Sequence, residues 1–183
     1  MIEHDILKSC QEECLDVHSD VYSAIIAQLK ASLWECCPYT FISSVAEPLL
    51  ESIASELVED SRAFAAKDPA AGNNIMNVVQ TYTSFKAVLH YRLAHRLAKE
   101  VDEKLLPDGA SFYPALISSR GKLLSGAELH HHSSIGRRFI LDHGVGTVFG
   151  ETTKLGDDCY VLGGVTLGAL GISNNLNGKR HPT

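Results

Sequence analysis

The sequence predicts an α+β protein, with an N-terminal α-helical bundle over residues 1–110 and a short left-handed parallel β-helix over residues 111–183. Apolar residues that return every three or four positions indicate the helical half. A six-residue repeat indicates the second half, because it matches neither a helix nor an alternating strand and is typical of a hexapeptide β-helix. The left hand is the usual one of hexapeptide proteins and does not follow from the spacing. The repeats begin at Leu129, Ile135, Leu141, Phe149, Leu155, Val161 and Leu167.

Three helical stretches are expected in the first half. Ser19 and Asp20 can cap a helix that Pro38 ends, with an apolar stripe along one face. The second stretch carries Phe41, Val45, Leu49, Ile53 and Leu57. After the turn-rich residues 68–74, a third stretch runs over residues 75–97. Residues 106–110 form another break, and residues 112–124 are expected to lead into the repeat as a further helix.

The β-helix is predicted to be short. Three six-residue units close one triangular turn, so seven units make little more than two coils, with a two-residue slip after the third unit. The ends of such a stack need covering, and the helical domain can cover one of them. The other end, at Thr183, shows no cap, so association with other copies or truncation is expected.

Composition excludes several classes of function. The chain has 183 residues, 45% of them hydrophobic, and a formal net charge of −6 without a basic stripe, which argues against nucleic-acid binding. It starts without a secretory signal, and its longest apolar run, residues 160–172, is shorter than the roughly 20 residues of a membrane span. A soluble cytoplasmic protein without a membrane or nucleic-acid partner is expected. Its five cysteines are expected to be reduced thiols, although Cys10 and Cys14 share a helix face and could form a metal or disulfide pair.

Glu128 and His143 form a candidate catalytic pair at the repeat. Asp142 and His143 interrupt a unit of Leu, Gly and Val, and a histidine that projects from a coil can accept a proton near neutral pH. Glu128 lies fifteen residues earlier, almost one coil of about eighteen, so stacking is expected to bring its carboxylate to the imidazole. A carboxylate–imidazole pair is the arrangement that activates a hydroxyl nucleophile. The alternative is that Glu128 and His143 are solvated edge residues.

Two further segments of the second half contain histidine. Arg180 and His181 follow a loop rich in Gly and Asn, which suits recognition of a carboxylate by a guanidinium, although a disordered basic tail is the alternative. His130, His131 and His132 are successive residues of an expected strand, where side chains alternate in direction. They are therefore not expected to converge on a metal ion.

The chain resembles the serine O-acetyltransferases, hexapeptide-repeat acyltransferases of cysteine biosynthesis. The resemblance runs from about residue 60 to the end of the chain. The motifs that carry it are Asp68-Pro-Ala, Phe85-Lys-Ala-Val-Leu-His-Tyr-Arg-Leu-Ala-His, Ile135-Gly-Arg-Arg, Leu141-Asp-His-Gly-Val-Gly, Val148-Phe-Gly-Glu-Thr, Gly164-Val-Thr-Leu-Gly and Lys179-Arg-His-Pro.

The resemblance implies an acetyl-CoA-dependent enzyme that acetylates the hydroxyl of L-serine, with no metal. In that family His143 would be the general base and Glu128, where aspartate is usual, its acidic partner. Asp68 and Asp142 would bind the ammonium group of serine, Arg180 its carboxylate, and His181 would lie beside the reacting hydroxyl. The matching glycine-rich motif assigns CoA binding to Gly164, Thr166 and Gly168.

The resemblance also implies a homotrimer or a dimer of trimers, with sites between neighbouring β-helices. The chain departs from the family at His131, where proline is usual, and in its longer loop before Arg180. Family members continue for several coils that form much of the CoA groove and a tail that binds O-acetylserine sulfhydrylase, so no complex with the sulfhydrylase is expected here. Two alternatives remain: O-acetylation of homoserine or another hydroxylated amino acid, and a non-catalytic oligomerisation module.

Overall fold

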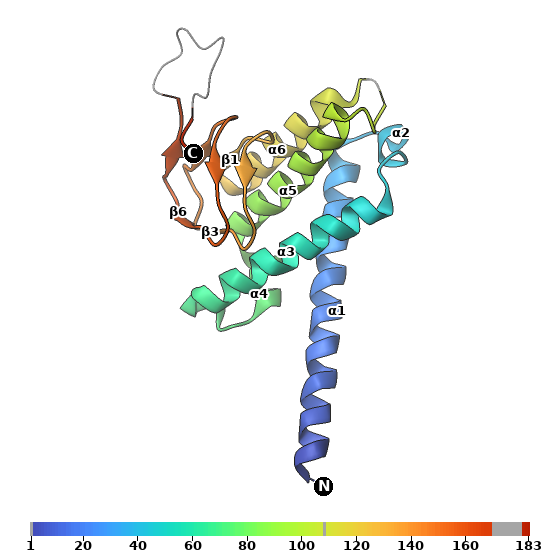
Figure 1. Ribbon diagram of the computed structural model, residues 1–183, viewed down its shortest axis with the longest axis vertical. Coiled ribbons are helices and arrows are strands. Elements are labelled where there is room, and N and C mark those ends of the chain that lie inside the picture. The colour runs from blue at the N-terminus through green and yellow to red at the C-terminus, as the bar shows by residue number, and fades with distance from the viewer. Residues whose placement is uncertain (1, 108, 170–180) are drawn as a thin grey trace.

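The computed structural model describes residues 2–107, 109–169 and 181–183, and it describes only the backbone of residues 2–18. A helical part is followed by a coil of short parallel strands, as predicted (Figure 1). The α-helices in these ranges are α1 (Ile2–Cys36), α2 (Tyr39–Ile42), α3 (Glu47–Lys67), α4 (Ile75–Thr81), α5 (Thr83–Asp102) and α6 (Tyr113–Ser125), and the 3-10 helices are η1 (Pro69–Ala71) and η2 (Ala110–Phe112).

The predicted helix limits need three corrections. The first helix begins at Ile2 rather than at Ser19, because no glycine or proline interrupts the residues between them. The second stretch is divided into α2 and α3, since Pro48 is suited to the first turn of a new helix and not to a helix interior. The third stretch is divided at Tyr82, whose backbone is extended (φ −82°, ψ 115°). The breaks after Lys67 and after Asp102 are confirmed.

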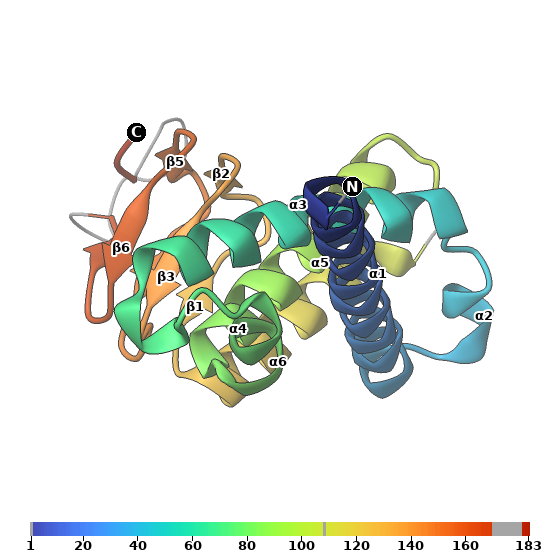
Figure 2. The ribbon, with the colours of Figure 1, turned by 90° about the horizontal axis from the view of Figure 1, so that it is seen from below.

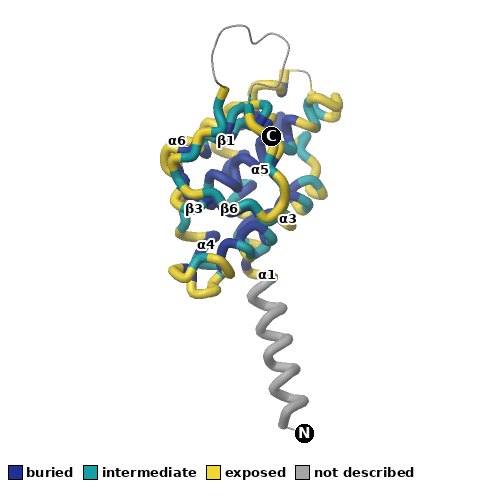
Figure 3. The backbone as a smooth tube through the Cα atoms, turned by 60° about the vertical axis from the view of Figure 1, so that its left-hand side comes forward, coloured by how far each residue is buried: buried dark blue, intermediate teal, exposed yellow. Residues whose placement is uncertain are grey.

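The helical core lies where α1, α3 and α5 cross, and α3 continues from there to the β-helix (Figure 2). Helix α5 is buried along most of its length between the other helices and the strands (Figure 3). Helix α6 packs against α5 so closely that a Cβ atom on Gly121 would lie 2.7 Å from Cβ of His90. Helix α6 confirms the helix predicted over residues 112–124 that leads into the repeat. None of the helices in the described ranges combines the length and apolarity that a membrane crossing requires.

In the part of the chain that the structure describes, seven short strands form the three faces of the β-helix. All pairings are parallel, in the orders β1-β4-β7, β2-β5 and β3-β6, which gives two coils and one further strand, as predicted. The strands are β1 (Glu128–Leu129), β2 (Ser134–Ile135), β3 (Ile140–Asp142), β4 (Val148–Phe149), β5 (Lys154–Leu155), β6 (Tyr160–Leu162) and β7 (Thr166–Leu167). The first four repeat hydrophobes are buried and the last three are partly buried. The six-residue spacing thus identified the residues that fill the coil.

One corner of the β-helix is longer than the others. Glu128 pairs with Val148, twenty residues later, whereas Val148 pairs with Thr166, only eighteen residues later. The two additional residues lie between β3 and β4, where the backbone turns through Gly144 and Gly146 with positive φ. This insertion changes which residue points inward, because Val145, four positions after Leu141, is 68% exposed, whereas Thr147 is fully buried.

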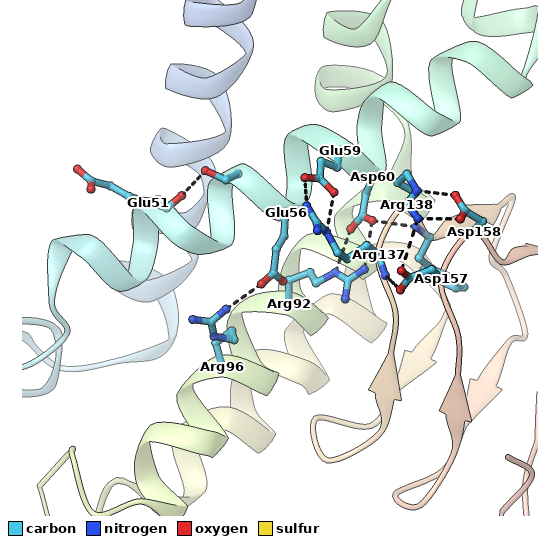
Figure 4. A network of polar contacts seen from close by, with 12 residues as sticks. Glu51, Glu56, Glu59, Asp60, Arg92, Arg96, Arg137, Arg138, Asp157 and Asp158 are labelled. Carbon is cyan, nitrogen blue, oxygen red and sulfur yellow. Dashed lines mark hydrogen bonds and ion pairs between the residues drawn. The ribbon is translucent and has the colours of Figure 1, made fainter.

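A buried polar junction joins the helices to the first coil (Figure 4). Arg92 on α5 donates from Nε and Nη2 to the carboxylate of Asp60 on α3, at 2.9 and 3.1 Å. The same guanidinium donates to the carbonyl groups of Ile135 and Gly136, at 2.7 and 2.5 Å. Asp60 Oδ1 also accepts from the backbone N–H of Phe139, at 2.8 Å. The helices thus cover one end of the coil and satisfy backbone groups that the strands leave open.

Candidate functional site

A cavity of about 540 Å³ opens where three segments meet: the end of α3, the start of α5 and the long corner after β3. Three of the predicted site residues, Asp68, Asp142 and His143, line this one cavity. A Cβ atom on Gly144 would lie 3.2 Å from Cβ of Ser84, so the corner lies directly against the first turn of α5. The cavity is lined by Asp68, Ala70, Thr81, Tyr82, Thr83, Ser84, Asp142, His143 and Val145.

Asp68 is held at the junction between α3 and η1. Its Oδ1 accepts the backbone N–H of Ala70 at 2.9 Å, which caps the 3-10 helix. Its Oδ2 accepts the hydroxyl of Tyr82 at 2.6 Å. The extended backbone at Tyr82 separates α4 from α5 and turns this phenol toward Asp68, fourteen residues earlier. Two donors therefore fix the orientation of the Asp68 carboxylate.

Asp142 and His143 lie at the end of β3. The His143 backbone is left-handed (φ 59°), an uncommon conformation for a residue with a side chain, and its imidazole is 83% exposed. Oδ1 of Asp142 lies 3.8 Å from Nε2 of His143, and Oδ2 accepts the hydroxyl of Tyr160 at 2.6 Å. An imidazole in this position can exchange a proton with a molecule in the cavity.

Both tyrosines were missed from the sequence. The pKa of Tyr82 is raised to about 12, chiefly by its hydrogen bond to Asp68, and that of Tyr160 is raised to about 12, chiefly by its hydrogen bond to Asp142. The charge of Asp142 also raises the pKa of Tyr82, and the charge of Asp68 also raises the pKa of Tyr160. Each phenol is therefore close enough to both carboxylates to be affected by their charges. The signal for Tyr160 was its place in the strand that stacks on β3, where the twenty-residue coil pairs it with Ile140, two positions before Asp142. Nothing in the sequence indicated a role for Tyr82.

The predicted contact between Glu128 and His143 is absent from the described residues. Glu128 Oε2 instead accepts from Nζ of Lys122 on α6 at 2.5 Å, and it lines a separate pocket of about 220 Å³ with His130. The assumption of an eighteen-residue coil explains the difference. The first coil has twenty residues, so the residue stacked on Glu128 is Val148, five positions beyond His143.

The remaining predicted residues lie on other parts of the β-helix. His181 lies at the corner after β4, where its Nδ1 is 2.8 Å from Oγ1 of Thr152 and its ring covers Gly150. Arg180 is outside the described residues. The expected CoA-binding residues lie on the last coil, with Gly164 at the corner after β6 and Thr166 exposed on β7, next to Gly168.

The three successive histidines do not alternate in direction as expected. Strand β1 ends at Leu129, so His130, His131 and His132 form a corner, and adjacent rings lie 4.4 Å apart between centroids. Partial burial, followed by the charges of the neighbouring imidazoles, lowers the pKa of His131 to about 4. Within the described ranges, no three His, Cys, Asp or Glu side chains are grouped as metal ligands.

These features define a class of protein: a hexapeptide-repeat β-helix behind a helical domain, with acidic and imidazole groups at one long corner. The chain is 42% identical over 127 residues to the serine acetyltransferase of Bacillus pumilus, covering 69% of this chain and 53% of that protein. It is 41% identical over 117 residues to the serine acetyltransferase of Helicobacter pylori, covering 64% and 61%. The chain is therefore homologous to the serine acetyltransferases.

Solved structures agree with the sequence comparison. Soybean serine acetyltransferase in complex with serine has a TM-score of 0.64 and 25% identity, covering 88% of this chain and 63% of that one. Serine acetyltransferase isoform 3 of Entamoeba histolytica in complex with cysteine has a TM-score of 0.61 and 29% identity, covering 91% and 53%. No protein-family model matches the chain. The chain spans about half the length of the curated relatives it matches.

Proposed function

We propose that this chain contains the acceptor site of an acetyl-CoA-dependent acetyltransferase that converts L-serine to O-acetylserine for cysteine biosynthesis. One observation carries the proposal. Asp68, Asp142 and His143, which are 75 residues apart at the extremes of the set, line a single cavity between the helices and the long corner. The cavity thus combines two groups that can bind an ammonium ion with one that can accept a proton.

In this proposal His143 acts as the general base. Its imidazole takes the proton of the serine hydroxyl while that oxygen attacks the carbonyl carbon of the acetyl thioester. The carbon–sulfur bond then breaks, the acetyl group remains on the serine oxygen, and the imidazolium returns the proton to the CoA sulfur. The exposed, left-handed position of His143 favours this role, because the imidazole is not part of the packing of the coil.

Asp68 and Asp142 bind the ammonium group of serine in this scheme. Both carboxylates have an orientation fixed by hydrogen bonds, and no lysine or arginine is among the described residues that line the cavity. Glu128 enters the scheme only by a change of partner, from Lys122 to His143. We assign CoA binding to the last coil at Gly164, Thr166 and Gly168, by analogy with the Brucella abortus serine acetyltransferase in complex with coenzyme A.

The carboxylate of serine is assigned to Arg180 and the place beside the reacting hydroxyl to His181, both on a neighbouring subunit of a homotrimer or dimer of trimers. The position of His181 favours this arrangement, because it lies at the corner with Thr152 and Gly150, whereas the cavity lies at the corner that carries His143. A site that uses both corners is completed most simply by two copies of the chain. We place the reaction in the cytoplasm, where the free thiols of Cys36, Cys37 and Cys159 stay reduced.

The test is a thiol-release assay with acetyl-CoA and the 183-residue chain. Release of CoA that requires L-serine, with O-acetylserine detected by mass spectrometry, would support the proposal. Faster release with homoserine would assign the acceptor differently. Absence of both acetyl transfer and saturable CoA binding in calorimetry would instead favour an oligomerisation module.

A further inference from the structure

The candidate site holds two carboxylates that are each bound by a tyrosine hydroxyl. Tyr82 donates to Oδ2 of Asp68 and Tyr160 donates to Oδ2 of Asp142, both at 2.6 Å. Hydrogen bonds from a phenol to a carboxylate are short and strong because the acceptor is charged. The reaction outlined above assigns neither phenol a role.

The two phenols come from different elements and reach the carboxylates from opposite parts of the fold. Tyr82 belongs to the helical part, where it occupies the extended residue between α4 and α5. Tyr160 belongs to β6, on the coil after the one that carries Asp142. Each domain therefore supplies one aspartate and one tyrosine, and both aspartates line the cavity.

Each hydroxyl occupies one carboxylate oxygen and leaves acceptor capacity on the other. Oδ1 of Asp142 lies 3.8 Å from Nε2 of His143, a distance that leaves this oxygen available to a ligand. Oδ1 of Asp68 accepts one backbone N–H and, as a carboxylate oxygen, can accept a second donor. A primary ammonium group has three N–H donors in a compact arrangement and can bind both aspartates at once.

We infer that Tyr82 and Tyr160 are positioning residues that make the acceptor site specific for a primary ammonium group, by fixing the orientations of Asp68 and Asp142. The inference rests on the proposed function, since it refines how the same site selects its acceptor. Without either hydroxyl, the corresponding carboxylate is free to rotate and to be hydrated, and the ammonium group loses part of a preformed site. Because both phenols have a pKa of about 12, they remain donors over the pH range in which an enzyme assay is run.

The experiment compares Tyr82→Phe and Tyr160→Phe with Tyr39→Phe, which removes a phenol hydroxyl from a 67% exposed side chain on α2. Phenylalanine keeps the ring, so only the hydrogen bond is removed. Isothermal titration calorimetry measures the affinity of each variant for L-serine, for ethanolamine, which keeps the ammonium and hydroxyl groups, and for 3-hydroxypropionate, which lacks the ammonium group. The thiol-release assay adds KM and kcat for L-serine and acetyl-CoA.

The expected result for Tyr82→Phe and Tyr160→Phe is a loss of at least about tenfold in affinity for L-serine and ethanolamine, the lower end of the effect of one hydrogen bond to a charged group. The affinity for 3-hydroxypropionate and the KM for acetyl-CoA stay within twofold, as do all values for Tyr39→Phe. Unchanged or tighter binding of L-serine, or an equal loss for all three ligands, would overturn the inference. Binding of L-serine without acetyl transfer by the unmodified chain would refute the proposed function alone, because the ammonium dependence would remain measurable.

Discussion

Replacing Arg92 by methionine is expected to destabilise the protein by about 3–5 kcal/mol, the usual effect of removing one partner of a buried ion pair. The side chains of Arg92 and Asp60 are 5% and 1% exposed, so the aspartate that remains is shielded from water. The carbonyl groups of Ile135 and Gly136 lose their donor in the same variant. Methionine preserves most of the volume, which limits the effect of an empty cavity.

Arg96→Met is the matched control, one helical turn further along α5. Arg96 Nη1 bonds to Glu56 Oε1 at 2.8 Å, between the same two helices, but the side chains are 27% and 30% exposed. An ion pair accessible to solvent contributes about 0–1 kcal/mol. Figure 4 shows both pairs. Urea denaturation followed by circular dichroism would give the free energy of unfolding of each variant, and equal losses would refute the burial argument.

The effect of Arg92→Met is also expected to depend on pH. Burial raises the pKa of Asp60, and the charge of Arg92 opposes that rise, so the pKa of Asp60 should rise further in the variant. A carboxyl whose folded pKa exceeds its unfolded value binds protons more readily in the native state, so the free energy of unfolding falls as pH rises through the folded pKa. The free energy of unfolding that Arg92→Met loses relative to the unmodified chain should therefore be smaller at pH 5 than at pH 8. A deficit independent of pH would show that lost carbonyl contacts, and not the isolated charge, cause the loss.

Three other predictions concern the site and the coil. His143→Ala should lower acetyl transfer by about 10²–10⁴-fold without changing the oligomer, because the side chain is exposed; thiol release and size-exclusion chromatography test this, and turnover near the normal rate would exclude the general-base role. Glu128→Gln should lower turnover less than tenfold, since its carboxylate binds Lys122; a loss as large as that of His143→Ala would restore Glu128 as the acidic partner. Gly136→Ala should destabilise the chain by about 1–3 kcal/mol, because the new Cβ would lie 2.4 Å from the backbone of Gly156. The control is Gly156→Ala, whose Cβ would meet nothing within 4 Å and which should be nearly neutral. Thermal unfolding compares the two variants, and equal shifts in Tm would contradict the geometry.

The β-helix could be predicted because its information is local. Each strand of a coil needs one inward hydrophobe. Leu129, Ile135 and Leu141 therefore predict the three strands of the first coil from their spacing alone, without knowledge of the rest of the chain. The same local rule failed at the long corner. The two-residue slip between Leu141 and Phe149 lengthens the first coil to twenty residues, so the expected contact of Glu128 with His143, which assumes eighteen, is replaced by the contact with Lys122.

The helices and the site needed information that spacing does not contain. The apolar stripe predicted a continuous helix through Tyr82, whereas the structure has an extended residue there whose phenol reaches Asp68. Threonine and tyrosine have modest helix propensity, so a tertiary contact can decide their conformation. Asp68 and Asp142 were selected through a family resemblance, and only the fold shows that they share a cavity. The partners of Arg92 are equally nonlocal, because they lie 32 to 44 positions away in sequence.

In a regular solenoid the same residues both stack on the neighbouring coils and present side chains to solvent. The insertion at the corner after β3 assigns the second role to separate residues. Rungs of constant length are constrained by their neighbours above and below, so a substitution whose side chain meets the next rung, such as Gly136→Ala, alters stacking. The two additional residues leave the side chains of His143 and Val145 83% and 68% exposed, so these two positions can change without altering the packed interior of the coil. The corner between β3 and β4 could be grafted onto the shorter corner of the next coil, between β6 and β7. Such a graft would test whether a longer corner alone can present a reactive histidine from a regular coil.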